Sequence, residues 1–164
     1  MRRFFSALVL LFILSSCEDQ VKFNNPALQG LKENVLWRAT LFTAAQAPDG
    51  SLTITAYQKN DVLTLKTAST AVKTYPLGID ITNKATLTEK ADGFNTVFST
   101  GKDRGNGQIV ITELDEDNHT ITGEFMFNAK NEFIDPLATP NVNFKKGIFH
   151  KVPVTIQPSS VKTF

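Results

Sequence analysis

The sequence predicts an all-β protein: an antiparallel β-sandwich or flattened barrel of about eight to ten strands that follows an N-terminal lipoprotein signal peptide. Three observations favour this fold class. Apolar residues of the mature part recur at every second position, as in strands with one buried face. Pro, Gly, Asn and Asp punctuate the chain at short intervals, as turns do. No stretch of ten or more residues has the pattern of an amphipathic helix.

Residues 1–16 have the layout of a bacterial lipoprotein signal peptide. Arg2 and Arg3 precede the apolar segment 4–14, which is too short for a spanning helix, since crossing the bilayer takes about 20 residues. Leu14-Ser15-Ser16-Cys17 then resembles the lipobox, in which the cysteine is acylated and the chain is cut before it. We therefore expect Cys17 to carry an S-diacylglycerol and an N-acyl group such as palmitate, and two or more such chains anchor a protein stably.

Two other interpretations of Cys17 are an ordinary secretory signal with a coincidental cysteine and a free buried thiol. Cys17 is the only cysteine of the chain, and an unpaired thiol is awkward in an oxidising compartment. Acylation removes that difficulty, which favours the lipoprotein.

Cleavage before Cys17 leaves 148 residues, which is enough for one domain without disulfides. We expect a lipidated tether and irregular lead-in at 17–34 (with one helical turn as an option), a single β domain at 35–157 and a tail at 158–164. Without Arg2 and Arg3 the chain has 15 basic and 16 acidic residues, and this balance argues against a nucleic-acid partner.

The first half of the β domain contains the clearest strands. Val35, Trp37, Ala39 and Leu41 recur at every second position, with Arg38 and Thr40 between them, which predicts one strand with these four on the same face. After the turn at 48–50, two alternating runs at 51–57 and 63–66 predict a hairpin. Their expected inward residues are Leu52, Ile54, Ala56, Leu63 and Leu65.

The second half begins with a short strand at 72–75 that Pro76 and Gly78 end, followed by less regular strands at 85–89 and 95–99. Strands at 108–114 and 120–127 are joined by the turn 115–119, and a last strand covers 141–154. The inward residues expected on 120–127 are Ile121, Gly123, Phe125 and Phe127.

One catalytic motif occurs by sequence. Ser99-Thr100-Gly101-Lys102 matches the Ser-x-x-Lys nucleophile motif of penicillin-recognising enzymes, which needs the serine at a helix start with the lysine one turn later. Here the motif leaves a strand for a glycine-rich loop and has no Ser-Asp-Asn or Lys-Thr-Gly partner. We expect no catalysis and no phosphate loop at this position.

Carboxylates concentrate at the turn 115–119. Glu113, Asp115, Glu116 and Asp117 offer oxygen ligands for Ca²⁺, but the positions that an EF-hand loop fills with Gly and Glu hold Thr120 and Met126. A solvated turn that keeps neighbouring strands soluble is the favoured interpretation.

Histidines and the single tryptophan complete the candidates. His119 and His150 are too few for a histidine zinc site. His150 is expected to share a face with Ile148 and Val152, as a partly buried, hydrogen-bonded side chain. Trp37 is expected in the core rather than on a ligand platform, because Val35 and Ala39 flank it on the same face.

Several segments resemble an uncharacterised family of small lipoproteins of flavobacteria and other Bacteroidota. They are residues 21–30 (VKFNNPALQG) with Trp37-Arg38-Ala39, Ile121-Thr122-Gly123-Glu124-Phe125 and Gly147-Ile148-Phe149, the last two like the paired Gly-x-Phe strands of that family. The resemblance implies a β-rich lipoprotein without assigned activity, so no functional residue except Cys17 is carried over. Physically, a glycine near a phenylalanine gives a large ring room across the sheet.

The expected function is a non-catalytic binding or scaffolding domain that Cys17 holds at the outer membrane, with an envelope protein or glycan as its partner. The residue after the cysteine is Glu18, whereas the inner-membrane retention signal has Asp at this position. Glu18 and Asp19 form only a short acidic run, which does not decide between the two leaflets of the outer membrane. We expect no enzymatic activity, cofactor or metal. One alternative is a lipocalin-like carrier of an apolar ligand. The other is a hydrolase of envelope polymers with Asp103, Asp115 or Asp117 as acid, which needs two carboxylates about 5–10 Å apart across a groove.

Overall fold

The computed structural model describes residues 27–91, 94–133 and 139–158, and in these residues the chain forms eleven β-strands. Within this part of the chain there is no helix with the length and apolar character needed to cross a membrane. The strands are β1 (Ala27–Lys32), β2 (Val35–Arg38), β3 (Leu41–Gln46), β4 (Leu52–Gln58), β5 (Asp61–Thr67), β6 (Thr74–Leu77), β7 (Lys84–Ala91), β8 (Phe94–Ser99), β9 (Asn106–Asp115), β10 (Thr120–Asn131) and β11 (Asn141–Ile156).

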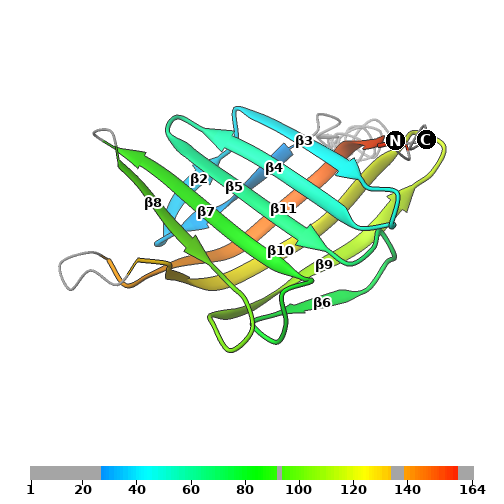
Figure 1. The fold of residues 1–164 in the computed structure, drawn as a ribbon. Helices are drawn as coiled ribbons and strands as arrows, with labels where there is room; N and C mark the ends of the chain where they lie inside the picture. Colours follow the sequence, from blue (N-terminus) through cyan, green and yellow to red (C-terminus); the bar gives the residue numbers. More distant parts are fainter. Residues whose placement is uncertain (1–26, 92–93, 134–138, 159–164) are drawn as a thin grey trace, which may run out of the picture.

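The strands form one continuous sheet that folds into two layers and closes on itself (Figure 1). One layer is β3-β4-β5-β7-β8, and the other is β2-β1-β11-β10-β9-β6. The layers join at two corners, where β11 pairs with β3 and β10 pairs with β8. The predicted flattened barrel is thus confirmed. Two details differ from the prediction. The described residues form eleven strands instead of eight to ten, and the β11–β3 pairing is parallel instead of antiparallel.

The first layer is built from successive hairpins, as the alternation predicts. Leu52, Ile54 and Ala56 of β4 are buried, and so are Leu63 and Leu65 of β5. Facing residues of the two strands pair in register from Leu52–Thr67 to Gln58–Asp61. Because successive side chains of a strand point to opposite faces, this register places the apolar set of both strands toward the second layer.

The N-terminal part of the described chain differs from prediction in two ways. Residues 27–32, within the expected irregular lead-in, form β1, because both of its edges find partners in β2 and β11. The expected strand from Val35 to Leu41 is two strands: β2 ends at Arg38, and β3 begins at Leu41 and pairs with β4. Trp37 is buried, whereas Val35 on the same face of β2 is 69% exposed. Leu41 lies in β3 and is 60% exposed, so the prediction of one strand with one buried face is wrong at these two positions.

The short strand β6 also lies later than predicted, at Thr74–Leu77, and contains Pro76 instead of ending before it. Proline has no N–H and therefore interrupts a strand that is paired on both sides. β6 pairs only with β9, at the edge of the sheet, so the missing donor of Pro76 can face solvent.

Two bulges in β11 change the direction of its side chains. Between Ile121 and Gly123 of β10 the partner strand advances from Val152 to Phe149, which inserts one extra residue at the left-handed Lys151. A second bulge lies at Lys146. The extra residue restarts the alternation, so Val152 is buried on the same side as Phe149. The expectation that His150 and Val152 share a face is therefore wrong.

The Gly-x-Phe segments of β10 and β11 face each other reciprocally. Gly123 pairs with Phe149, and Phe125 pairs with Gly147. A Cβ placed on Gly147 would lie 2.6 Å from three ring atoms of Phe125, and one placed on Gly123 would lie 2.4 Å from the ring of Phe149. Each ring thus occupies the space above the glycine of the neighbouring strand, as the sequence predicts for these pairs.

Aromatic rings fill the interior between these strands and β2. Phe144 has an edge contact with Trp37, at a centroid distance of 5.5 Å, and a stacked contact with Phe127 at 5.1 Å. Phe125 lies against both phenylalanines. Trp37 is only 2% exposed, which confirms its expected place in the core. Such ring contacts add about 0.5–1.5 kcal/mol per pair to the burial of their area.

Candidate functional site

The sequence-predicted lipidation site, Cys17, lies outside the described residues, as does the signal peptide 1–16. Among the described residues, polar and charged side chains gather at three places in the fold. These are a cleft beside the β9–β10 turn, a buried polar cluster at the end of β8 and an ionic cluster at the β4–β5 turn.

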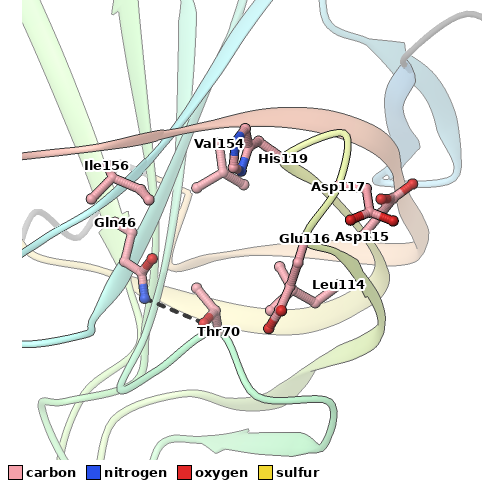
Figure 2. Close-up of a pocket in the computed structure, with 9 residues that line it drawn as sticks. All are labelled: Gln46, Thr70, Leu114, Asp115, Glu116, Asp117, His119, Val154 and Ile156. Carbon is pink, nitrogen blue, oxygen red and sulfur yellow. Dashed lines mark hydrogen bonds between the residues drawn. The ribbon is translucent and has the colours of Figure 1, made fainter.

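The cleft has a volume of about 530 Å³ and lies where β9, β10, β11 and β3 end (Figure 2). Leu114, Val154 and Ile156 give it an apolar wall, and Ile156 is 65% exposed. Gln46 donates a long hydrogen bond of 3.4 Å to the hydroxyl of Thr70, which connects β3 to the loop after β5 across the cleft.

The rim of the cleft is the acidic β9–β10 turn, which sequence analysis singled out. The carboxylate of Asp115 accepts hydrogen bonds from the backbone and side-chain N–H groups of Asn118, at 2.9 and 2.8 Å. These bonds, the side-chain one first, lower the pKa of Asp115 below its ordinary value. The backbone of Val154 donates to the carbonyl of His119 and ties the turn to β11. The rim is therefore an ordered, negatively charged edge.

Three acidic side chains and one histidine line the cleft, but they do not converge. In Figure 2 Glu116 extends toward Leu114, while Asp115 and Asp117 extend to the other side of the turn. Across the described residues, no group of three or more His, Cys, Asp or Glu side chains is arranged to hold a metal ion. The structure places His119 on the rim, beside Val154 of β11, and His150 four residues earlier on the same strand.

Two further acidic candidates lie elsewhere. Asp103 is in the turn between β8 and β9, where its N–H donates to the carbonyl of Gly78 at 3.0 Å, and it is not among the residues that line the cleft. Glu113 is exposed on β9 and does not line the cleft either. Of the three acids named for the hydrolase alternative, Asp115 and Asp117 line the cleft and Asp103 does not.

The Ser-x-x-Lys segment forms a buried hydrogen-bonded cluster. Ser99 and Thr100 are fully buried at the end of β8. The Ser99 hydroxyl donates to Glu132 at 2.6 Å and accepts a hydrogen bond from Arg104. The Thr100 hydroxyl accepts from the backbone N–H of Ala85 at 3.0 Å. The serine hydroxyl is thus held between Glu132 and Arg104 at the end of β8.

Glu132 connects this cluster to two cations. Its carboxylate lies 3.0 Å from the guanidinium of Arg104 and 3.7 Å from the ammonium of Lys84. The pKa of Glu132 is lowered, first by the hydrogen bond from Ser99 and then by the charges of Lys84 and Arg104, although partial burial opposes this.

A second ionic cluster, around Asp61, joins the two layers. Asp61 accepts hydrogen bonds from Lys32 of β1 at 2.6 Å and from the indole N–H of Trp37 at 3.1 Å. Lys32 also pairs with Glu89 of β7. Burial alone would lower the pKa of Lys32, but its hydrogen bonds to Asp61 and Glu89 raise it above the ordinary value. Sequence reasoning missed this cluster, because its members are far apart in the chain and only the need of a buried indole N–H for an acceptor points to it.

Comparison with known proteins assigns the chain to a family. Residues 24–153 match the model of a domain of unknown function, DUF6252. The chain belongs to this family. No curated protein and no solved structure matches this chain. The membership confirms the resemblance to an uncharacterised family, and the match begins close to the Asn-Asn-Pro segment that carries it.

Proposed function

We propose that this DUF6252 protein is a lipoprotein anchored by Cys17 at the outer membrane, and that its β domain binds an envelope partner through the cleft beside the β9–β10 turn. The observation that carries the proposal is the composition of this cleft. An apolar wall of Leu114, Val154 and Ile156 stands beside a rim of three carboxylates, and among the described residues no lysine or arginine lines it. A concave site with apolar walls and a few charged groups suits an amphipathic partner segment with positive charge.

The position of β1 supports an arrangement in which the cleft lies at the anchored side. Ala27, the first described residue, pairs with His150 of β11, and β11 continues from there to Val154 and Ile156 in the cleft wall. Nine residues lie between Cys17 and Ala27, and the ten Cα-to-Cα steps of an extended chain reach about 35 Å at most. The tether therefore limits how far from the membrane a partner can meet the cleft.

The aromatic interior favours a binding surface over a carrier cavity. Rings of Trp37, Phe125, Phe127 and Phe144 contact each other at centroid distances of 5.1–6.3 Å, in the volume that an enclosed ligand would need. An interior packed this closely leaves little free volume for a ligand.

The lowered pKa of Asp115 speaks against the hydrolase alternative at this cleft. A glycosidase general acid must hold its proton near neutral pH, so its pKa is raised. Asp115 has the opposite shift, because Asn118 stabilises its charged form. A carboxylate whose charged form is favoured is suited to binding a cation.

Anchoring is tested by Cys17→Ser. We expect unprocessed precursor, no incorporation of labelled palmitate and loss of the protein from the outer-membrane fraction. Processing and membrane retention of the Cys17→Ser protein equal to wild type would refute the anchor. Protease treatment of intact cells then distinguishes the leaflets, since only a surface-facing domain is cleaved.

Cleft binding is tested with a photo-crosslinking amino acid at Ile156, compared with the same group at Tyr57 of β4, which is also exposed but outside the cleft. We expect a partner crosslinked from position 156 only, and lost when Glu116 and Asp117 are changed to Lys. A crosslinked product that forms equally from position 57, or that survives the charge reversal, would contradict cleft binding.

A further inference from the structure

A second hollow, remote in sequence from the cleft, lies at the turn between β8 and β9. It has a volume of about 500 Å³ and shares no lining residue with the cleft. The residues that line it are Ile81, Lys84, Thr100, Gly101, Lys102 and Arg104. Three of these six side chains are cationic, and none is acidic. We propose that this hollow is a binding site for a phosphate or sulfate group carried on a sugar-sized molecule.

The turn that presents the cations is fixed by backbone hydrogen bonds. Gly101 and Arg104 bond to each other in both directions, at 2.9 and 3.0 Å. Asp103 is bonded to Gly78, and Thr100 to Ala85. An anion bound here therefore meets a turn that is already ordered, which reduces the entropic cost of binding.

Glycines let this turn pack closely against its neighbours. A Cβ on Gly78 would lie 2.4 Å from the carbonyl oxygen of Gly105, and a Cβ on Gly105 would lie 2.4 Å from that of Asn128. Both glycines have positive φ. The turn is thereby seated on β10, so that the positions of Lys102 and Arg104 are determined by the sheet.

Arg104 is oriented for an anion. Its Nη2 donates to the buried Ser99 hydroxyl and to Glu132, and the guanidinium lies beside Gly101. Both hydrogen bonds to the described residues leave from Nη2, so the donors on Nη1 and Nε remain for a ligand. These two donors lie on different edges of the guanidinium, so each can give one charge-assisted hydrogen bond to an oxygen of a phosphate or sulfate.

The charge balance remains positive with the acidic neighbour included. Glu132 offsets one of the three positive charges, because it pairs with both Arg104 and Lys84. Its lowered pKa keeps it ionised and so keeps Arg104 in place. Lys102 is exposed on the turn and adds a mobile ammonium.

The size of the hollow and the presence of Ile81 at its rim indicate a ligand larger than a bare ion. Ile81 is 76% exposed at the rim and gives an apolar surface against which the ring of a sugar can lie. A phosphate or sulfate ion alone fills only a small part of about 500 Å³. A neutral sugar lacks the charge that the two lysines and Arg104 recognise.

The test is calorimetric titration of the mature acylated chain, in a neutral detergent, with glucose 6-phosphate, glucose 6-sulfate, inorganic phosphate and glucose. We expect the two sugar esters to bind, inorganic phosphate to bind more weakly and glucose not to bind, with affinities that fall as salt is added. Equal binding of glucose, or the absence of binding by both esters, would overturn the proposal. Equal binding of inorganic phosphate would overturn the sugar component.

The matched variants are Lys102→Gln in the turn and Lys90→Gln at the far end of β7, both exposed lysines. We expect Lys102→Gln to weaken ester binding about two- to fivefold, the range of one exposed charge pair, and Lys90→Gln to leave it unchanged. An equal effect of the two changes would show attraction to net charge rather than to this site. Arg104→Lys, which keeps the charge and loses the planar fork, is expected to weaken binding further. Substitutions in the acidic cleft should not alter these values, so the result is independent of the function proposed above.

Discussion

Replacing Gly147 by alanine tests the reciprocal packing of β10 and β11. The added Cβ would lie 2.6 Å from three ring atoms of Phe125, whereas ordinary contacts begin at 3.4 Å. The ring must therefore retreat by about 0.8 Å, toward Phe127 and Phe144, with which it is already in contact. Overpacking of this kind costs about 1–3 kcal/mol, so we expect the free energy of unfolding to fall by that amount.

Gly101→Ala is the matched control. Its Cβ would approach nothing closer than 3.7 Å, and its backbone does not need a glycine conformation. Its stability should be unchanged or slightly higher, because alanine reduces the entropy of the unfolded chain. Unfolding in urea, followed by the emission of the single, buried Trp37, measures all variants at a constant m-value.

The double variant Gly147→Ala, Phe125→Leu distinguishes ring crowding from a backbone effect. Phe125→Leu alone is expected to destabilise by removing core contacts, but it makes room for the new methyl group. The two changes should therefore cost clearly less together than the sum of their separate costs. Strict additivity, or a Gly147→Ala protein as stable as Gly101→Ala, would refute the packing explanation.

Three other predictions concern the ionic clusters. Asp61→Ala should lower the free energy of unfolding by about 1–3 kcal/mol, because Lys32 and the indole of Trp37 lose their shared acceptor, and Trp37 emission should shift or become easier to quench; an unchanged urea midpoint would contradict this. Because the pKa of Lys32 is raised in the fold, its stabilising contribution is complete below pH 10.5 and is lost as the pH rises through the folded value; a Lys32→Met protein should show a smaller loss in alkaline denaturation than wild type. The pKa of Glu132 is lowered, so its contribution is present above pH 4.5 and is lost as the pH falls; Glu132→Gln should flatten the acid limb of the stability curve, and an unaltered slope would exclude the role of this carboxylate.

Local alternation was sufficient for much of the fold. Leu52, Ile54 and Ala56 are buried as predicted, because β4 is paired on both sides over its whole length and has no bulge. The same reasoning failed at Leu41, where two strands replace one, and at His150, where the bulge at Lys151 restarts the period. Whether a strand breaks or bulges depends on partners that are distant in the chain, and a single alternating pattern does not contain that information.

Among the polar sites, too, those made of neighbouring residues could be recognised in the sequence and those made of distant residues could not. The acidic turn 115–117 was recognised in the sequence because its residues are adjacent. The Asp61 cluster draws Lys32, Trp37 and Glu89 from three other strands, and the hollow at Lys102 depends on Lys84 and Arg104 being brought to one corner. Each of these sites is created by the register of the closed sheet, so spacing along the chain gives no signal for it.

The place of β11 in the sheet has a consequence for the order of events during synthesis. β11 is the last strand made, yet it pairs with β1, β10 and β3, so the layers cannot close at that corner before residue 156 is available. Pairing between the two ends of a chain is slow, because a long loop must be ordered first. A nascent chain of this kind stays open until β11 has been synthesised, and the domain completes its fold only then.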